Sequence, residues 1–154
     1  MILALQMLHA NWKNCNCYEK VFIRYLDTNI CIFFLRGKMD IDVKIDEVGA
    51  ENCFISEITV AELLYGVECS DNNDAKNRKV VIDFIKEMQI IPLSTALYVY
   101  AEEKAKLRKS GTLIDDLDIF IGATAISNDM ILVTDNEKHL QRISKIKIEN
   151  WVER

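Results

Sequence analysis

The chain has 154 residues, of which 50% are hydrophobic and 28% charged, a balance typical of one compact globular domain and not of a disordered or fibrous protein. Its formal net charge of −5 excludes a general basic surface, so a nucleic-acid role has to rest on local patches. The 5 cysteines are an odd number, which indicates reduced thiols and not a disulfide framework.

The first twenty residues begin with a short apolar run that has no basic leader and is too short to span a bilayer. We expect residues 1–20 to be an extension, or translation from an upstream start codon, and residues 21–154 to form the domain. No other stretch approaches transmembrane length, so we expect a cytoplasmic protein that does not engage a membrane.

From residue 21 onward, short β-rich runs alternate with helical patterns. In chain order, the pattern predicts a strand at Val21–Leu26, a helix at Ile30–Arg36 that ends at Gly37, a strand at Cys53–Ile55, helices at Thr59–Cys69 and Ala75–Met88, a strand at Gln89–Pro92, a helix at Ala96–Ser110 capped by Ser94 or Thr95, a buried helix at Leu117–Ser127, a strand at Ile131–Val133, a short helix at Glu137–Ile143 and a possible last strand near Ile146–Ile148. This alternation predicts an α/β fold in which helices cover both faces of a central parallel sheet.

Two acids follow strands of this predicted sheet. Asp27 comes directly after the first strand, and Asp135 follows Ile131–Val133 after one threonine. Ligands of such sheets collect outside the carboxyl ends of the strands, so both acids are expected on one rim. Taken alone, each also has a simpler explanation, because aspartate is favoured in turns and at helix caps.

Other acids lie near helix starts. Thr59 to Glu62 fits a capping box, but Glu62 also lies in an apolar neighbourhood, where a lone carboxylate needs a partner. Asp115, Asp116 and Asp118 crowd into the start of the most hydrophobic helix. One of them is expected as the cap, whereas three repel one another unless a cation or a proton compensates.

Acids at four strand or helix ends on one rim are what a hard divalent cation requires. Mg²⁺ or Mn²⁺ held there polarises a water and stabilises the charge that develops on a phosphodiester. The chain has 2 histidines, and it has no Gly-rich phosphate loop and no Walker lysine, which disfavours a nucleotide-driven motor.

Four segments occur in order over about residues 22–152: YLDTNICIFFLRGK, ISEITVAELLYGVECS, IDDLDIFIGATAISNDMILVTDNEKHL and IENW. They resemble the PIN-domain toxins of bacterial toxin–antitoxin pairs, the VapC-like ribonucleases. The resemblance implies the PIN fold and Mg²⁺- or Mn²⁺-dependent endonucleolytic cleavage of RNA, often a structured RNA such as tRNA. It also implies a small cognate antitoxin that inhibits the enzyme, and a homodimer.

By this resemblance, Asp27, Glu62 and Asp118 are catalytic acids that bind the metal. The fourth position departs from the family pattern, because Asn136 stands where relatives often have an acid, with Asp135 beside it. Either Asp135 takes over as the fourth catalytic and metal-binding acid, or the amide of Asn136 acts through water.

The remaining candidate residues are polar or basic. Hydrogen bonds that orient ligands or phosphate are expected from Thr28, Asn29, Thr134 and Asn136. Asp115 and Asp116 are assigned to capping or to supporting roles around the site. RNA needs cations at the edge of the groove, and the candidates are Arg36, Lys38, Lys106 and Arg108, although a charged helix face is usually only solvated.

Three functions stay open at this point. The first is the metal-dependent ribonuclease toxin. The second is a non-catalytic PIN module that acts as an interaction or scaffold domain, which Asn136 in the fourth position keeps open. The third is a phosphoacceptor receiver-like domain, which is disfavoured because no lysine directly follows Ile131–Val133.

Overall fold

The computed structural model describes residues 22–70 and 75–152. The predicted extension at residues 1–20 and the first residue of the predicted first strand lie outside this part, so the domain boundary at residue 21 stays a prediction. Among the described residues, no helix combines the length and the apolar character that crossing a membrane requires.

The sheet has five strands, all parallel, in the order β3-β2-β1-β4-β5. The strands are β1 (Arg24–Leu26), β2 (Cys53–Ser56), β3 (Gln89–Ile91), β4 (Ile131–Val133) and β5 (Lys147–Glu149). The predicted α/β class and parallel sheet are therefore confirmed.

The strand order reverses at β1, because the chain builds β2 and β3 on one side of it and β4 and β5 on the other. The crevice at such a reversal, outside the carboxyl ends of the strands, is where open α/β sheets bind ligands. Leu26 of β1 pairs in register with Val133 of β4. The next residues, Asp27 and Thr134, therefore leave the sheet side by side in this crevice.

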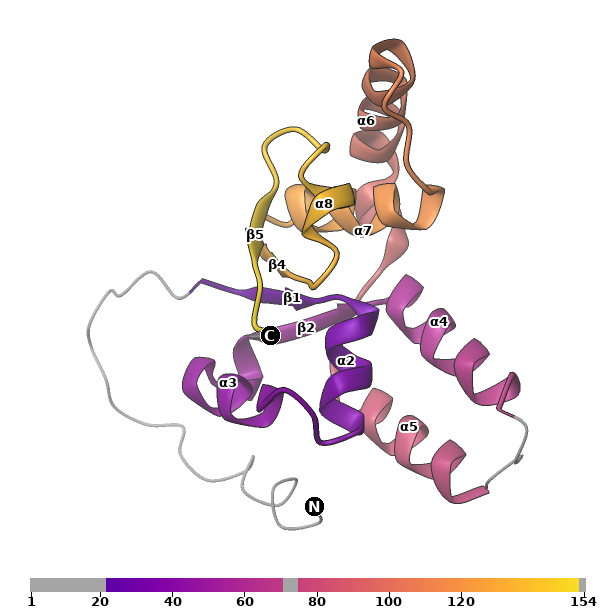
Figure 1. Ribbon diagram of the computed structural model, residues 1–154, viewed down its shortest axis with the longest axis vertical. Coiled ribbons are helices and arrows are strands. Elements are labelled where there is room, and N and C mark those ends of the chain that lie inside the picture. The colour runs from indigo at the N-terminus through magenta and orange to yellow at the C-terminus, as the bar shows by residue number, and fades with distance from the viewer. Residues whose placement is uncertain (1–21, 71–74, 153–154) are drawn as a thin grey trace.

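Helices cover both faces of the sheet (Figure 1). One face carries α2 (Thr28–Leu35), α3 (Ile41–Val48), α4 (Glu57–Glu68) and α5 (Ala75–Glu87), and the other carries α6 (Leu97–Ser110), α7 (Asp116–Ser127) and α8 (Glu137–Leu140). Successive side chains of a strand point to opposite faces of the sheet. Leu26 and Val133 therefore pack in the hydrophobic core on the α2–α5 side, and Tyr25 and Leu132 pack in the core on the α6–α8 side.

Helix α3 was not predicted from the sequence. It has 8 residues, of which only Ile41 and Ile45 are buried, and its first turn has no side-chain cap bond. The cap residue, Asp40, adopts a left-handed conformation with φ of 48°. The sequence of this segment therefore has only a weak apolar stripe and a weak helix-start signal. Packing against α2 stabilises the helix.

The predicted caps of two helices were wrong. Helix α4 begins two residues earlier than expected, because the hydroxyl of Ser56 accepts the backbone N–H of Thr59 at 3.2 Å. Thr59 is therefore inside the helix, and Glu62 is not its capping-box partner. Helix α6 follows a 3-10 turn at Leu93–Ala96 and has no side-chain cap, because the hydroxyl of Thr95 donates to a backbone carbonyl instead.

Candidate active site

Asp27 lies at the carboxyl end of β1, where it is 6% exposed. The hydroxyl of Thr134, which follows β4, donates to Oδ2 of Asp27 at 2.6 Å. The backbone N–H of Thr28 donates to Oδ1 at 2.7 Å, so Asp27 is also the N-cap of α2. Asp27 therefore caps α2 from its position at the end of β1. The two interpretations of this residue from the sequence, helix cap and acid on the rim of the sheet, do not exclude each other.

Glu62 reaches this position from the second turn of α4. The hydroxyl of Thr28 donates a short hydrogen bond to Oε2 of Glu62, which joins the start of α2 to α4. The start of α4 is itself fixed by a buried network, in which the hydroxyl of Tyr25 donates to Ser56 at 2.7 Å. The strand that delivers Asp27 therefore also positions the helix that delivers Glu62.

Asp118 comes from the first turn of α7, on the other side of the crevice. The side-chain amide of Asn136 donates toward both of its carboxylate oxygens, at 3.4 Å each. The backbone N–H of Asn136 donates to the hydroxyl of Thr134 at 2.9 Å. Through Thr134, the segment after β4 holds Asp27, and through Asn136 it contacts Asp118, so it connects the two acids.

The charges of Glu62 and Asp118 act on the buried Asp27. The pKa of Asp27 is raised to about 6. Burial is the main cause, and the charges of Glu62 and Asp118 contribute to the rise, whereas the hydrogen bonds from Thr134 and Thr28 partly oppose it. Burial also raises the pKa of Asp118, which His139 and Asn136 partly counteract. Negative charge on this rim is therefore unfavourable until a cation or a proton compensates it.

The donor set fits a hard divalent cation, because its charged members are all carboxylates. Within residues 22–70 and 75–152, no three acidic, histidine or cysteine side chains already stand close enough to share one ion. A complete cage is not required for Mg²⁺, which keeps several waters and binds through one or two protein carboxylates. Asp27, Glu62 and Asp118 supply carboxylates of this kind, and the charges of Glu62 and Asp118 act on Asp27.

The other acids near the site divide between structural and open roles. Asp115 caps α7 and accepts a backbone N–H of the first turn at 2.8 Å, and Asp116 pairs with Lys104 of α6 at 2.7 Å. Capping is thus seen for Asp115, whereas Asp116 forms an ion pair with the neighbouring helix. Asp135 is half-buried in the bend between Thr134 and Asn136. Its neighbour Asn136 contacts Asp118.

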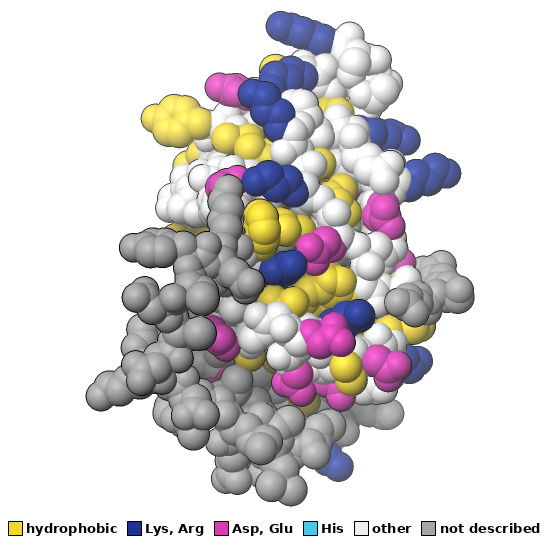
Figure 2. All heavy atoms as spheres, turned by 90° about the vertical axis from the view of Figure 1, so that its left-hand side faces the viewer, with side chains coloured by type: hydrophobic (Ala, Val, Ile, Leu, Met, Phe, Trp, Pro, Cys, Tyr) yellow, Lys and Arg dark blue, Asp and Glu magenta, His cyan; other side chains and the backbone are white. Residues whose placement is uncertain are grey.

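The remaining predicted residues are Asn29 and the four basic candidates for RNA contact. Asn29 accepts the N–H of the next residue at 2.9 Å, a local bond within α2. Arg36 ends α2, roughly 13 Å along the helix axis from Asp27, and Lys38 follows it. Lys106 and Arg108 lie on α6, at the end of the molecule where Figure 2 shows lysine and arginine side chains gathered. RNA contact by these four stays a prediction.

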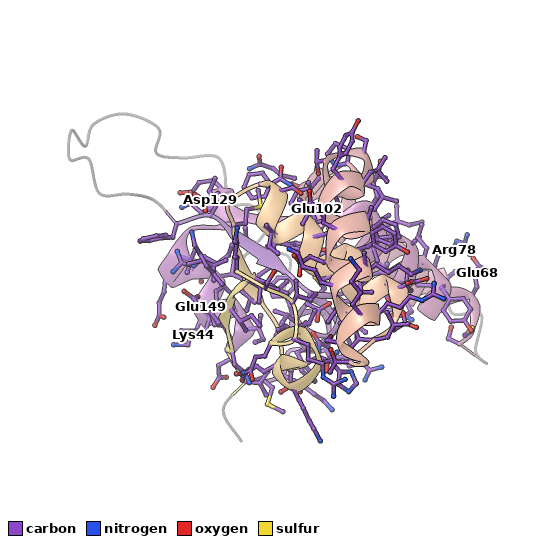
Figure 3. All side chains as sticks on the ribbon, turned by 90° about the horizontal axis from the view of Figure 1, so that it is seen from above. Lys44, Glu68, Arg78, Glu102, Asp129 and Glu149 are labelled. Atoms are coloured by element: carbon purple, nitrogen blue, oxygen red, sulfur yellow. The ribbon has the colours of Figure 1, made fainter. Side chains whose placement is uncertain are left out.

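Sequence reasoning missed one residue beside the acids, His139, and one buried acid outside the site, Glu103. Nδ1 of His139 on α8 lies 3.6 Å from Oδ2 of Asp118. Glu103 on α6 is 4% exposed and accepts hydrogen bonds from Ser144 and Lys106, whereas its neighbour Glu102 lies on the exposed face of α6 (Figure 3). A single histidine in a surface helix and one glutamate in a charged run carry no sequence signal that distinguishes them.

The chain was compared with known proteins. The family model described as PIN domain matches residues 24–146. "Ribonuclease VapC2" of Haemophilus influenzae is 36% identical over 129 residues, which cover 82% of this chain and 96% of the relative. "tRNA(fMet)-specific endonuclease VapC" of Salmonella typhimurium is 32% identical over 127 residues, with the same two coverages of 82% and 96%.

Solved structures contain similar chains as well. The structure of VapBC2 from Rickettsia felis bound to a promoter DNA fragment contains a chain similar to this one, with a TM-score of 0.75 at 32% identity, over 84% of this chain and 98% of that one. DNA-bound VapBC from Salmonella typhimurium contains another, with a TM-score of 0.77 at 32% identity and the same coverages of 84% and 98%. The chain therefore belongs to the PIN-domain family, as a VapC-like member.

Proposed function

We propose that this protein is a divalent-cation-dependent endoribonuclease, the toxin of a type II toxin–antitoxin pair. The observation that carries the proposal is that Glu62 and Asp118 lie close enough to the buried Asp27, which Thr134 and Thr28 hold, for both charges to act on it. Relatives named as ribonucleases and similar chains in VapBC structures support it.

The residues of the site fix where the carboxylates point. Thr134 and Thr28 hold the buried Asp27, and Thr28 also holds Glu62. The side chain of Asp118 is 21% exposed, so RNA approaches the rim from the Asp118 side. A bound Mg²⁺ or Mn²⁺ supplies there the positive charge that polarises a water and stabilises the phosphodiester oxygens during cleavage.

We assign the fourth position on the rim to Asn136, because its amide contacts Asp118 and its backbone N–H is fixed by Thr134. A neutral amide orients an acidic ligand or a water without adding a fourth negative charge. A catalytic role of Asp135 stays a prediction. Loss of cleavage in Asp135→Asn, with Asn136→Ala still active, would reverse this assignment.

The substrate and the partners follow from the same relatives. One relative is named a tRNA(fMet)-specific endonuclease, so tRNA is the substrate class to test first. VapBC structures among the similar ones support a small antitoxin as a partner of this chain. We retain a homodimer as part of the proposal.

The test is cleavage of purified tRNA by the purified chain with Mg²⁺ or Mn²⁺, with excess chelator, and with the Asp27→Asn variant. We expect cleavage only with the cation and only in the unmodified chain. Cleavage that persists in excess chelator contradicts the metal requirement. A folded protein that binds no cation and cuts no RNA in any condition favours the non-catalytic interaction module.

A further inference from the structure

His139 lies beside Asp118. Its Nδ1 atom is 3.6 Å from Oδ2 of Asp118, and its side chain is 51% exposed. Asn136 approaches the same carboxylate from the same segment, the connection between β4 and α8. The proposed function above gives no role to this imidazole.

The spacing of the two atoms is close to that of two ligands on one ion. Ligands about 2.1 Å from a single cation lie roughly 3.0 to 3.4 Å from each other, depending on the coordination geometry. The Nδ1–Oδ2 distance of 3.6 Å exceeds this by only a few tenths of an ångström. Because the His139 side chain is half exposed, a small rotation closes the difference.

We propose that His139 donates an imidazole nitrogen to the divalent cation that Asp118 holds, so that the site selects first-row transition ions such as Mn²⁺ over Mg²⁺. This inference rests on the proposed function. Mg²⁺ is a hard ion that takes oxygen ligands, whereas first-row transition ions bind nitrogen-containing sites with an affinity that is weakest for Mn²⁺ and rises towards Ni²⁺ and Cu²⁺. A site of carboxylates alone has no such basis for discrimination.

Alternatively, His139 is only a counter-ion to Asp118. This role predicts the opposite change in cation affinity when His139 is replaced. A ligand contributes to holding the ion, so its loss weakens Mn²⁺ binding and leaves Mg²⁺ binding nearly unchanged. A protonated imidazole that only pairs with Asp118 repels any cation, so its loss strengthens the binding of both ions.

The first experiment detects the nitrogen directly. Mn²⁺ is added to the full chain without RNA, and electron spin-echo spectroscopy measures the modulation from a bound ¹⁴N nucleus. We expect this signal in the unmodified chain and in Lys138→Ala, the matched control on the same helix, and its loss in His139→Ala. Bound Mn²⁺ without a nitrogen signal, or with a signal that survives His139→Ala, overturns the proposal.

The second experiment measures affinities, again without RNA, by Mn²⁺ titration and Mg²⁺ competition. We expect His139→Ala to weaken Mn²⁺ binding about tenfold or more and Mg²⁺ binding less than about twofold, while Lys138→Ala leaves the ratio unchanged. An unchanged ratio in His139→Ala overturns the proposal.

Asp27→Asn separates this inference from the proposed function. If the unmodified chain binds Mn²⁺ without a nitrogen signal and Asp27→Asn abolishes this binding, the metal site remains supported and only the role of His139 is wrong. If the unmodified chain binds neither ion, the metal-dependent function fails as well.

Discussion

Two buried carboxylates, Asp27 and Glu103, have opposite environments. Glu103 lies on α6, far along the chain from the crevice, and is 4% exposed against 6% for Asp27. It accepts the N–H and the hydroxyl of Ser144, at 3.0 and 2.7 Å, and pairs with Lys106 at 2.6 Å. Burial acts to raise its pKa, but these bonds to Lys106 and Ser144 lower it below the ordinary value.

Asp27 receives two hydrogen bonds but no positive partner among these contacts, and two other acids act on it. Its pKa is raised to about 6. The comparison shows how to distinguish the two kinds of buried acid. Glu103 is paired with a cation of the protein itself, whereas for Asp27 the proposed function supplies the cation from outside.

The largest expected effect is that of Asp27→Asn on cleavage. We expect tRNA cleavage to fall at least about 10³-fold, because the buried member of the acid set no longer carries charge. The metal-free variant is expected to be more stable than the unmodified chain by up to about 3 kcal/mol at neutral pH, since an unfavourable buried charge is removed. Cleavage rates and urea unfolding in chelator measure both quantities. Lower stability with intact cleavage would reverse the interpretation of this residue.

Thr134→Val tests whether Asp27 needs its orienting hydroxyl. The substitution keeps the shape of the side chain and removes the 2.6 Å hydrogen bond and the acceptor for the N–H of Asn136. We expect metal affinity to fall about 10- to 100-fold. Titration with Mn²⁺ checks this, and Thr112→Val, an exposed threonine outside the crevice, is the matched control. Equal affinities in both variants would deny Thr134 a role in the site.

Glu103→Gln addresses the structural member of the pair. We expect the free energy of unfolding to fall by about 1–3 kcal/mol, because the ion pair with Lys106 is lost and the bonds from Ser144 weaken. Cleavage per folded molecule is expected to stay within about twofold of the unmodified chain. Glu102→Gln, on the exposed neighbour, is the control for chemical denaturation. A large loss of cleavage in folded Glu103→Gln would blur the distinction between the two acids.

The pH dependence of Glu103→Gln sharpens the same distinction. Because the folded protein holds the pKa of Glu103 below its ordinary value of 4.5, its stabilising contribution is complete above that pH and is lost as the pH falls through the folded pKa. We therefore expect the stability difference between the unmodified chain and Glu103→Gln to shrink below about pH 4.5. Urea unfolding at pH 3.5 and pH 6 measures it, and a constant difference would contradict the lowered pKa.

The smallest effect is expected for Lys106→Ala. Lys106 was predicted to bind RNA, but its ammonium group is paired with the buried Glu103. We expect RNA affinity to change little, whereas Arg108→Ala, on the exposed last turn of α6, lowers it and reduces its salt dependence. Filter binding at two salt concentrations compares the variants. A larger loss of affinity in Lys106→Ala than in Arg108→Ala would restore the original prediction.

Asp27 and Glu103 also differ in how far the sequence alone predicts their positions. Asp27 follows an apolar run that is recognisable as a strand, and Asp118 opens the most hydrophobic helix, so local pattern alone places both at element ends. Glu103 lies in a run of charged residues with the same local pattern as an exposed helix face. Its burial depends on Ser144, 41 residues away, which no local pattern reveals.

The alternation of strands and helices and the parallel sheet were determined by the sequence alone, because apolar periodicity encodes which face of each element is buried. The sequence also placed Asp27 after a strand and Asp118 near a helix start, whereas the grouping of Glu62 with them came from the family resemblance. Only the tertiary structure decided that Asn136 contacts Asp118, that His139 joins them, and that Ser56 instead of Thr59 caps α4. These contacts depend on strand order and on the register of Leu26 with Val133, which long-range packing sets.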